Sequence, residues 1–96
     1  MSIDQIRHTI SQYKGPLRDS YKVREIGIFG SAVRGQDTGV SDLDLLVEFS
    51  EPIGLFRFIE LEEFLTKVIG KKVDLVTKKA LKPAIKEEIL REVVYT

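Results

Sequence analysis

The chain has 96 residues, of which 43% are hydrophobic and 31% charged, and its 15 basic residues balance 15 acidic ones. These values indicate one globular domain over residues 1–96, and they argue against a basic nucleic-acid coat or membrane binding by bulk charge. Because cysteine is absent and His8 is the one histidine, the sequence excludes disulfides, thiolate zinc sites and multi-histidine metal sites. A metal site must therefore use carboxylate oxygens, which favour hard cations such as Mg²⁺.

The N-terminus lacks the basic region and the apolar core of a signal peptide. The longest stretch without a charged residue, 26–33, is too short to cross a membrane. We therefore expect a protein of the cytoplasm that makes no contact with membranes.

The spacing of apolar residues predicts helices and strands that alternate along the chain. Apolar residues three or four positions apart indicate amphipathic helices, whereas alternation or a short β-branched run indicates a strand. In chain order, the expected elements are a helix over 2–14 with a short second piece over 17–21 after Gly15-Pro16, a strand over 23–29, one helical turn over 32–34, a loop over 35–41, a strand over 43–49, a helix over 55–69, a strand over 72–77 and a helix over 81–94. The order αβαβαβα predicts an α/β (α+β) fold in which a small mixed β-sheet is packed by helices.

The same spacing predicts which helix residues face the core. They are Ile3, Ile6, Ile10 and Tyr13 in the first helix, Leu55, Phe58, Ile59, Leu65, Val68 and Ile69 in the helix over 55–69, and Leu81, Ile85, Ile89 and Val93 in the last helix. Gly70 is expected to end the helix over 55–69, and Pro83 is tolerated in the first turn of the last one.

Three aspartates point to a metal site. Asp42 and Asp44 open the strand over 43–49, and residues two apart on a strand project from one face with Cα atoms roughly 6.5–7 Å apart. Two unpaired carboxylates this close repel each other, and a divalent cation removes the repulsion. Asp74 interrupts an apolar strand, so three carboxylates meet at one sheet edge if its strand neighbours that of Asp42 and Asp44. The structural alternative is that all three are caps or solvated edge residues.

Gly30-Ser31 lies at a strand-to-helix junction, where a phosphate group is readily bound. Glycine lets the backbone approach a phosphate closely, and the start of a helix offers free N–H groups. The Ser31 hydroxyl adds a donor, and Arg34, one turn later, reaches the outer phosphates in this interpretation. In the alternative interpretation, Gly30-Ser31 is only a turn and Arg34 pairs with Asp37 or Glu25.

One spaced motif of the chain consists of Gly30-Ser31, ten intervening residues, Asp42-x-Asp44 and a later aspartate in an apolar strand. This motif resembles that of the nucleotidyltransferase superfamily, which includes DNA polymerase β. The short chain and the stretch Gly-Ser-x-x-Arg-Gly…Ser-Asp-Leu-Asp-Leu are similar to the minimal nucleotidyltransferases, over about residues 3–95. This resemblance implies a nucleotidyltransferase fold like the palm of DNA polymerase β. It also implies an antitoxin paired with a HEPN ribonuclease toxin, to which AMP from ATP is transferred on a tyrosine.

The resemblance assigns a role to each residue of the motif. Asp42 and Asp44 are expected to bridge two Mg²⁺ ions, for which Mn²⁺ is a possible substitute, and Asp74 to complete the second ion's shell and accept the proton of the attacking hydroxyl. Gly30 and Ser31 are expected to hold the β- and γ-phosphates of ATP, and Arg34 the outer phosphates. Asp42, Asp44 and Asp74 are thus the expected catalytic and metal-binding residues.

The chain also departs from its relatives. Many of them have a second basic residue after Gly-Ser, where this chain has Ala32-Val33, and larger members carry a further domain over the nucleotide. Base recognition and acceptor binding are therefore expected from a partner, such as a HEPN-like toxin in a hetero-oligomer, or from a second copy in a homodimer. Two alternatives stay open: a non-catalytic antitoxin that acts by binding, and a nucleotidyltransferase with a small-molecule or RNA acceptor, of which zero net charge disfavours RNA.

Overall fold

The computed structural model describes residues 2–35 and 42–96, so the expected loop over 35–41 lies outside the described residues except for Gly35. The elements in chain order are α1 (Ile3–Ser11), α2 (Lys14–Tyr21), β1 (Val23–Phe29), the 3-10 turn η1 (Gly30–Ala32), β2 (Leu43–Phe49), α3 (Gly54–Ile69), β3 (Val73–Thr77), the 3-10 turn η2 (Lys78–Ala80), α4 (Pro83–Glu92) and β4 (Val94–Tyr95). No helix in these ranges is long and apolar enough to cross a membrane.

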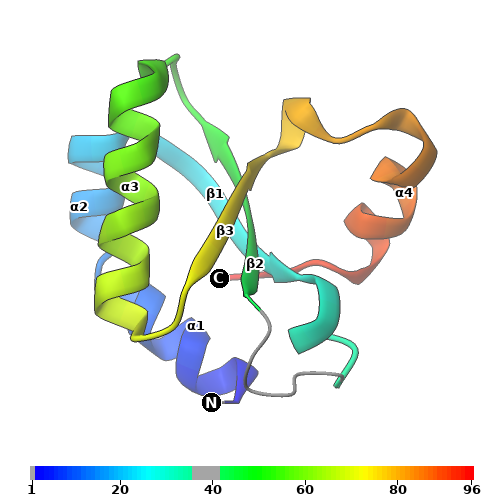
Figure 1. The fold of residues 1–96 in the computed structure, drawn as a ribbon. Helices are drawn as coiled ribbons and strands as arrows, with labels where there is room; N and C mark the ends of the chain where they lie inside the picture. Colours follow the sequence, from blue (N-terminus) through cyan, green and yellow to red (C-terminus); the bar gives the residue numbers. More distant parts are fainter. Residues whose placement is uncertain (1, 36–41) are drawn as a thin grey trace.

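One four-stranded sheet, in the order β3-β2-β1-β4, forms the centre of the molecule. Strand β2 pairs with β3 in parallel, whereas β1 pairs with β2 and with β4 in antiparallel fashion. Figure 1 shows α1, α2 and α3 on one side of this sheet and α4 on the other. The expected small mixed sheet packed by helices is therefore confirmed.

The main core lies between the sheet and the first three helices. Alternate residues of β2, at 43, 45 and 47, face this core and are almost completely buried, together with Ile6 and Ile10 of α1. The intervening residues of β2 project toward the side of α4, where Phe29, Leu46 and Leu81 form a second, smaller cluster. Because Asp42 and Asp44 alternate with the core residues, they project toward the side of α4 as well.

The first two helices divide differently from the prediction. Helix α1 ends at Ser11 rather than at residue 14, and α2 begins at Lys14, so Gly15 and Pro16 lie in the first turn of α2 instead of separating two pieces. The first amide groups of a helix have no partner within the helix, so a proline without an N–H group is accommodated there.

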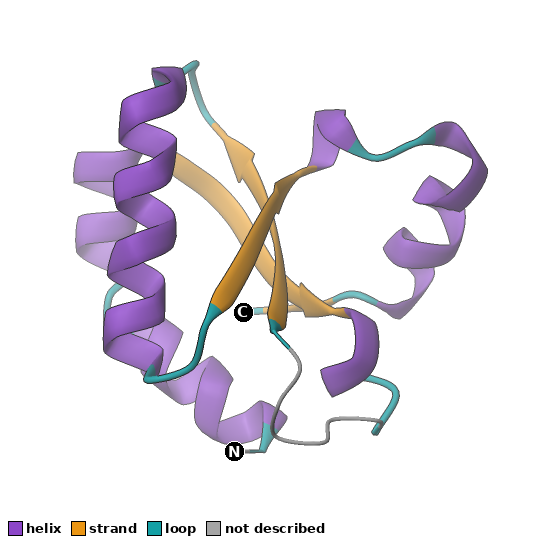
Figure 2. Cartoon of the chain, viewed as in Figure 1, coloured by secondary structure: helices purple, strands orange, loops and turns teal. Residues whose placement is uncertain are grey.

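The C-terminal end corrects the prediction of a helix over 81–94. Helix α4 ends at Glu92, and Val94 and Tyr95 form β4, which pairs with Ile28 and Gly27 of β1 (Figure 2). Gly27 permits this close approach, because a Cβ atom there would lie 2.6 Å from Val93 Cγ2. A run of two valines and a tyrosine also favours a strand over a helix.

The inner faces of α3 and α4 were predicted only in part. Leu55 and Ile59 are 70% and 42% exposed, whereas Leu61 joins Leu65 in the core. At about 100° per residue, positions 55 and 59 lie roughly 80° and 120° around the helix from Leu65, outside the buried stripe. In α4, Ile85 is exposed, and no residue of that helix is fully buried.

Candidate active site

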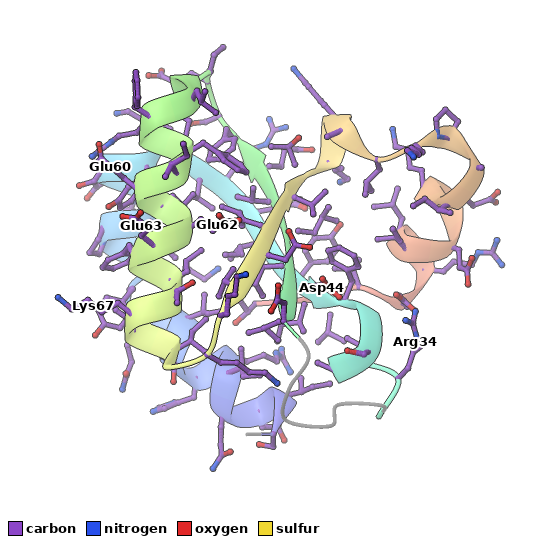
Figure 3. The ribbon with its side chains drawn as sticks, in the orientation of Figure 1. Arg34, Asp44, Glu60, Glu62, Glu63 and Lys67 are labelled. Carbon is purple, nitrogen blue, oxygen red and sulfur yellow. The ribbon has the colours of Figure 1, made fainter. Side chains whose placement is uncertain are left out.

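Strand register brings the predicted site residues to one end of the sheet. Strand β1 ends where β2 and β3 begin, so Asp44 is the pairing partner both of Phe29, in β1, and of Asp74, in β3. The expectation that the strand of Asp74 neighbours the strand of Asp44 is therefore confirmed. Figure 3 shows Asp44 near Arg34, beside the η1 turn that follows β1.

Gly30 connects β1 to η1 and is buried beneath the Asp44 carboxylate. Its φ of +80° lies in the left-handed region, which side chains other than glycine rarely adopt. A Cβ atom at this position would also collide with Asp44 Oδ2. Both observations require glycine at position 30, and they show that the Asp44 carboxylate lies directly against the backbone of the Gly-Ser turn.

The Asp44 carboxyl has a raised pKa. Burial is the largest cause, followed by the negative charges of Asp74 and Asp42, while the guanidinium of Arg34 acts in the opposite direction. Burial and neighbouring anions both disfavour the charged carboxylate. The site therefore carries a local excess of negative charge, of the kind that a bound cation relieves.

Asp42 and Asp74 are more exposed than Asp44. Asp42 Oδ2 lies 3.8 Å from Lys72 Nζ, and Asp74 lies on β3, one of the two edge strands of the sheet. Among residues 2–35 and 42–96, no three carboxylate or imidazole groups are gathered closely enough to hold a metal ion in their present rotamers. The three aspartates thus share one end of the sheet and interact electrostatically, but their oxygens do not form a preassembled coordination shell.

Chemically, the donor set still fits Mg²⁺. All three side chains offer carboxylate oxygens, the donors that hard cations prefer, and β2 and β3 set two of them in register. Rotation of the two exposed aspartates is enough to alter the separation of their oxygens, because their backbones are fixed by the sheet. A bound cation would favour such a rotation, because it would relieve the excess of negative charge around Asp44.

The η1 turn places Arg34 one turn after Gly30. The amides of Val33 and Arg34 both donate to the Gly30 carbonyl, at 3.1 and 3.2 Å, and Ser31 lies half-buried within the turn. A single helical turn follows the strand as expected, but it spans Gly30–Ala32 rather than residues 32–34, so Gly30 and Ser31 lie within it. Of the two alternative partners of Arg34, Glu25 pairs with Lys78 instead, whereas Asp37 lies outside the described residues.

Sequence reasoning missed the residue that occupies this turn, Glu92. Its Oε1 accepts a hydrogen bond from the Gly30 amide at 3.0 Å, and both its carboxylate oxygens lie 3.2 Å from Arg34 Nη1. One signal was available. An acidic residue at the C-terminal end of a helix opposes the helix dipole, so Glu92 needed a positive partner elsewhere.

The nucleotidyltransferase domain family matches this chain over residues 10–96, which include every residue of the site. The chain belongs to this family. This nucleotidyltransferase is 47% identical over 95 residues to the protein adenylyltransferase MntA of Thermococcus cleftensis, a match that covers 99% of this chain and 96% of that protein.

Solved structures agree with the assignment. The nucleotidyltransferase superposes on a solved minimal nucleotidyltransferase with a TM-score of 0.81 and 32% identity, covering 98% of this chain and 95% of the other. It also superposes, with a TM-score of 0.68 and 20% identity, on a chain from the complex of tri-AMPylated Shewanella oneidensis HEPN toxin with its MNT antitoxin. That match covers 97% of this chain and 70% of the other, and it establishes a shared fold.

Proposed function

We propose that this nucleotidyltransferase is a Mg²⁺-dependent protein adenylyltransferase and an antitoxin. It transfers AMP from ATP to a tyrosine hydroxyl of a partner HEPN ribonuclease toxin in the cytoplasm, and pyrophosphate is released. The observation that carries this proposal is the strand register that sets Asp44 beside Asp74, directly against the Gly30 turn. Near full-length similarity to a protein adenylyltransferase supports the choice of a protein as acceptor.

Each side chain of the site has one task in this reaction. Asp42 and Asp44 would hold two Mg²⁺ ions, which would supply charge neutralisation for the triphosphate and activation of the acceptor hydroxyl. The acceptor oxygen bonds to the α-phosphorus, the bond from that phosphorus to the bridging oxygen breaks, and pyrophosphate leaves. Asp74, next to Asp44 on the edge strand β3, would help to hold the second ion and would take the proton of the hydroxyl.

The η1 turn positions the leaving group. The Gly30 amide and the Ser31 hydroxyl donate to the β- and γ-phosphates, and Arg34 pairs with the outer phosphates through its guanidinium. Group transfer of this kind depends mainly on alignment and charge neutralisation. A site without a covalent nucleophile, built on a strand end and a rigid turn, is suited to that task.

The fold match to a chain of the toxin–antitoxin complex motivates the choice of a HEPN toxin as partner. In that complex the toxin is tri-AMPylated, so the proposed transferred group, the proposed kind of acceptor protein and the fold occur together in one system. An antitoxin that acts only by binding remains the competing hypothesis, because the three aspartates do not form a preassembled metal site in the described residues.

A labelling experiment tests the proposed function. The purified protein is incubated with Mg²⁺ and with the co-expressed protein that the neighbouring gene encodes, here called the neighbouring protein. Separate reactions contain ATP, GTP, CTP or UTP with a label on the α-phosphate. We expect label from ATP alone to appear on a tyrosine of the neighbouring protein, located by mass spectrometry. Label on a small molecule or RNA, or no transfer from any nucleotide, contradicts the proposal.

Cation and nucleotide are expected to stabilise the fold through Asp74. A ligand at 100 times its Kd stabilises a protein by about 2.7 kcal/mol, a rise in Tm of roughly 10–20 °C at this size. We expect millimolar Mg²⁺ with ATP to give such a rise in the wild type and little or none in Asp74→Ala, measured by thermal denaturation.

The matched control for this measurement is Asp19→Ala. Asp19 is an exposed aspartate of α2 that pairs with the adjacent Arg18, so its removal takes away the same charge far from the site. The control variant is expected to retain the full shift. Equal shifts in the wild type and Asp74→Ala mean that the cation binds elsewhere.

A further inference from the structure

An internal carboxylate occupies the place that the proposed function gives to a phosphate. Glu92 accepts the Gly30 amide hydrogen bond and pairs with Arg34, so it engages two of the groups that we assign to the triphosphate. Its side chain is 17% exposed, whereas that of Arg34 is 48% exposed. A planar carboxylate on a backbone N–H group and a guanidinium is the same kind of contact that a phosphate oxygen makes.

The backbone of Glu92 is fixed in this place by the fold. Two residues later the chain enters β4, whose Val94 pairs with Ile28 of β1, and the Val93 side chain packs against Gly27. The Glu92 backbone is therefore tied to β1, the strand that ends just before Gly30. Rotation about the side-chain bonds of Glu92 is therefore the way in which its carboxylate can leave the η1 turn while α4 and β4 stay intact.

We propose that Glu92 competes with the triphosphate for the Gly30 amide and Arg34, and that its carboxylate leaves both groups when the nucleotide binds. This inference rests on the proposed function, since it assumes that the η1 turn receives phosphates. Without nucleotide, Glu92 neutralises Arg34 and satisfies the Gly30 amide. A monovalent or weakly charged anion gains little by displacing it, whereas a metal-bound triphosphate offers several charged oxygens at once. Glu92 thus favours a metal–triphosphate ligand over simple anions.

The electrostatics of the site support this role. The Glu92 and Asp44 carboxylates both lie against Gly30, so Glu92 adds a second negative charge at the place where a further anion would bind. Its contacts with Arg34 are partly solvated, and partly solvated ion pairs are weak. Exchange of one carboxylate for the incoming phosphates is therefore feasible, and removal of Glu92 takes away both a competitor and a repelling charge.

The test measures binding rather than transfer. The ligand is an ATP analogue whose α,β-bridging oxygen is replaced by a methylene group, so that AMP cannot be released, and Mg²⁺ is present. By isothermal titration calorimetry we expect Glu92→Ala to bind this analogue roughly 3- to 10-fold more tightly than the wild type, a gain of about 0.7–1.4 kcal/mol. We expect inorganic phosphate to bind measurably only to the variant.

Two further variants separate charge from structure. Glu92→Gln retains an oxygen that accepts from the Gly30 amide but lacks the negative charge, and we expect an affinity between those of the wild type and Glu92→Ala. Glu87→Gln removes the same charge from α4, where Glu87 pairs with Arg91 on the exposed surface, and we expect wild-type affinity. Thermal denaturation confirms that each variant is folded.

The outcomes distinguish this inference from the proposed function. Equal or weaker binding of the analogue by Glu92→Ala and Glu92→Gln, with normal binding by the wild type, overturns the inference and leaves the function in place. Weaker binding would mean that Glu92 orients Arg34 for the ligand, and equal binding that Glu92 does not compete with it. Failure of the wild type and of both Glu92 variants to bind the analogue overturns the proposed function and the inference together.

Discussion

Replacement of Asp44 or Asp42 by asparagine is expected to lower the rate of AMP transfer by more than about 100-fold, a rise in barrier of about 2.7 kcal/mol. Asparagine has nearly the shape of aspartate but lacks its charge, so it holds Mg²⁺ poorly and leaves the triphosphate unneutralised. The rate is measured as incorporation of α-labelled AMP into the partner protein. Retention of more than about a tenth of the wild-type rate, a loss of only ~1.4 kcal/mol, shows that the residue is not a metal ligand.

Asp44→Asn, which is expected to lower the rate, is expected to raise stability, and this rise serves as the control that the variant is folded. Burial and neighbouring carboxylates raise the pKa of Asp44 in the folded protein, so stability is lost as the pH rises from the ordinary pKa of aspartate to the raised one. In metal-free buffer at neutral pH we expect Asp44→Asn to be slightly more stable than the wild type, with a gain in Tm of at most about 4 °C. The difference is expected to vanish in acid, where Asp44 is protonated.

The sequence predicted those parts of the fold whose signal is local. Strands β1 and β2 lie at the predicted residues, because a β-branched run and a strict alternation identify them without help from the rest of the chain. Strand β4 has only two residues and exists because Gly27 leaves room beside it, a condition set by a distant segment. Periodicity within 81–94 therefore could not separate it from the helix before it.

The candidate site divides in the same way. Gly30 and Asp44 were expected together on the spacing of one motif, and the strand register places the carboxylate against the glycine. The contact of Glu92 with Gly30 joins residues 62 positions apart and depends on how α4 returns across the sheet. No local pattern encodes that return. Side-chain rotamers, which decide whether three aspartates gather around an ion, are likewise beyond a sequence pattern.

Addition of the partner toxin is expected to increase the rate of ATP consumption by at least about 100-fold over the isolated protein. At the Gly30–Asp44 end of the sheet, Asp44 is only half-buried and Asp42 and Asp74 are exposed. Two hollows of the described structure lie elsewhere, along α2 and β1 and between β2 and η2. A partner that docks over this end excludes water, strengthens the electrostatic contacts and supplies the hydroxyl in one step. Pyrophosphate release with and without the toxin measures the difference.

The fate of the toxin after separation decides between an enzyme and a blocker. Transfer forms a covalent bond, so toxin purified away from the wild type is expected to carry the mass of AMP and to lack ribonuclease activity. Toxin purified from Asp42→Asn is expected to be unmodified and active, although that variant retains its docking surface. If both toxin preparations have the unmodified mass and equal activity, and either antitoxin inhibits only while bound, inhibition arises from binding alone and the aspartates have no catalytic role.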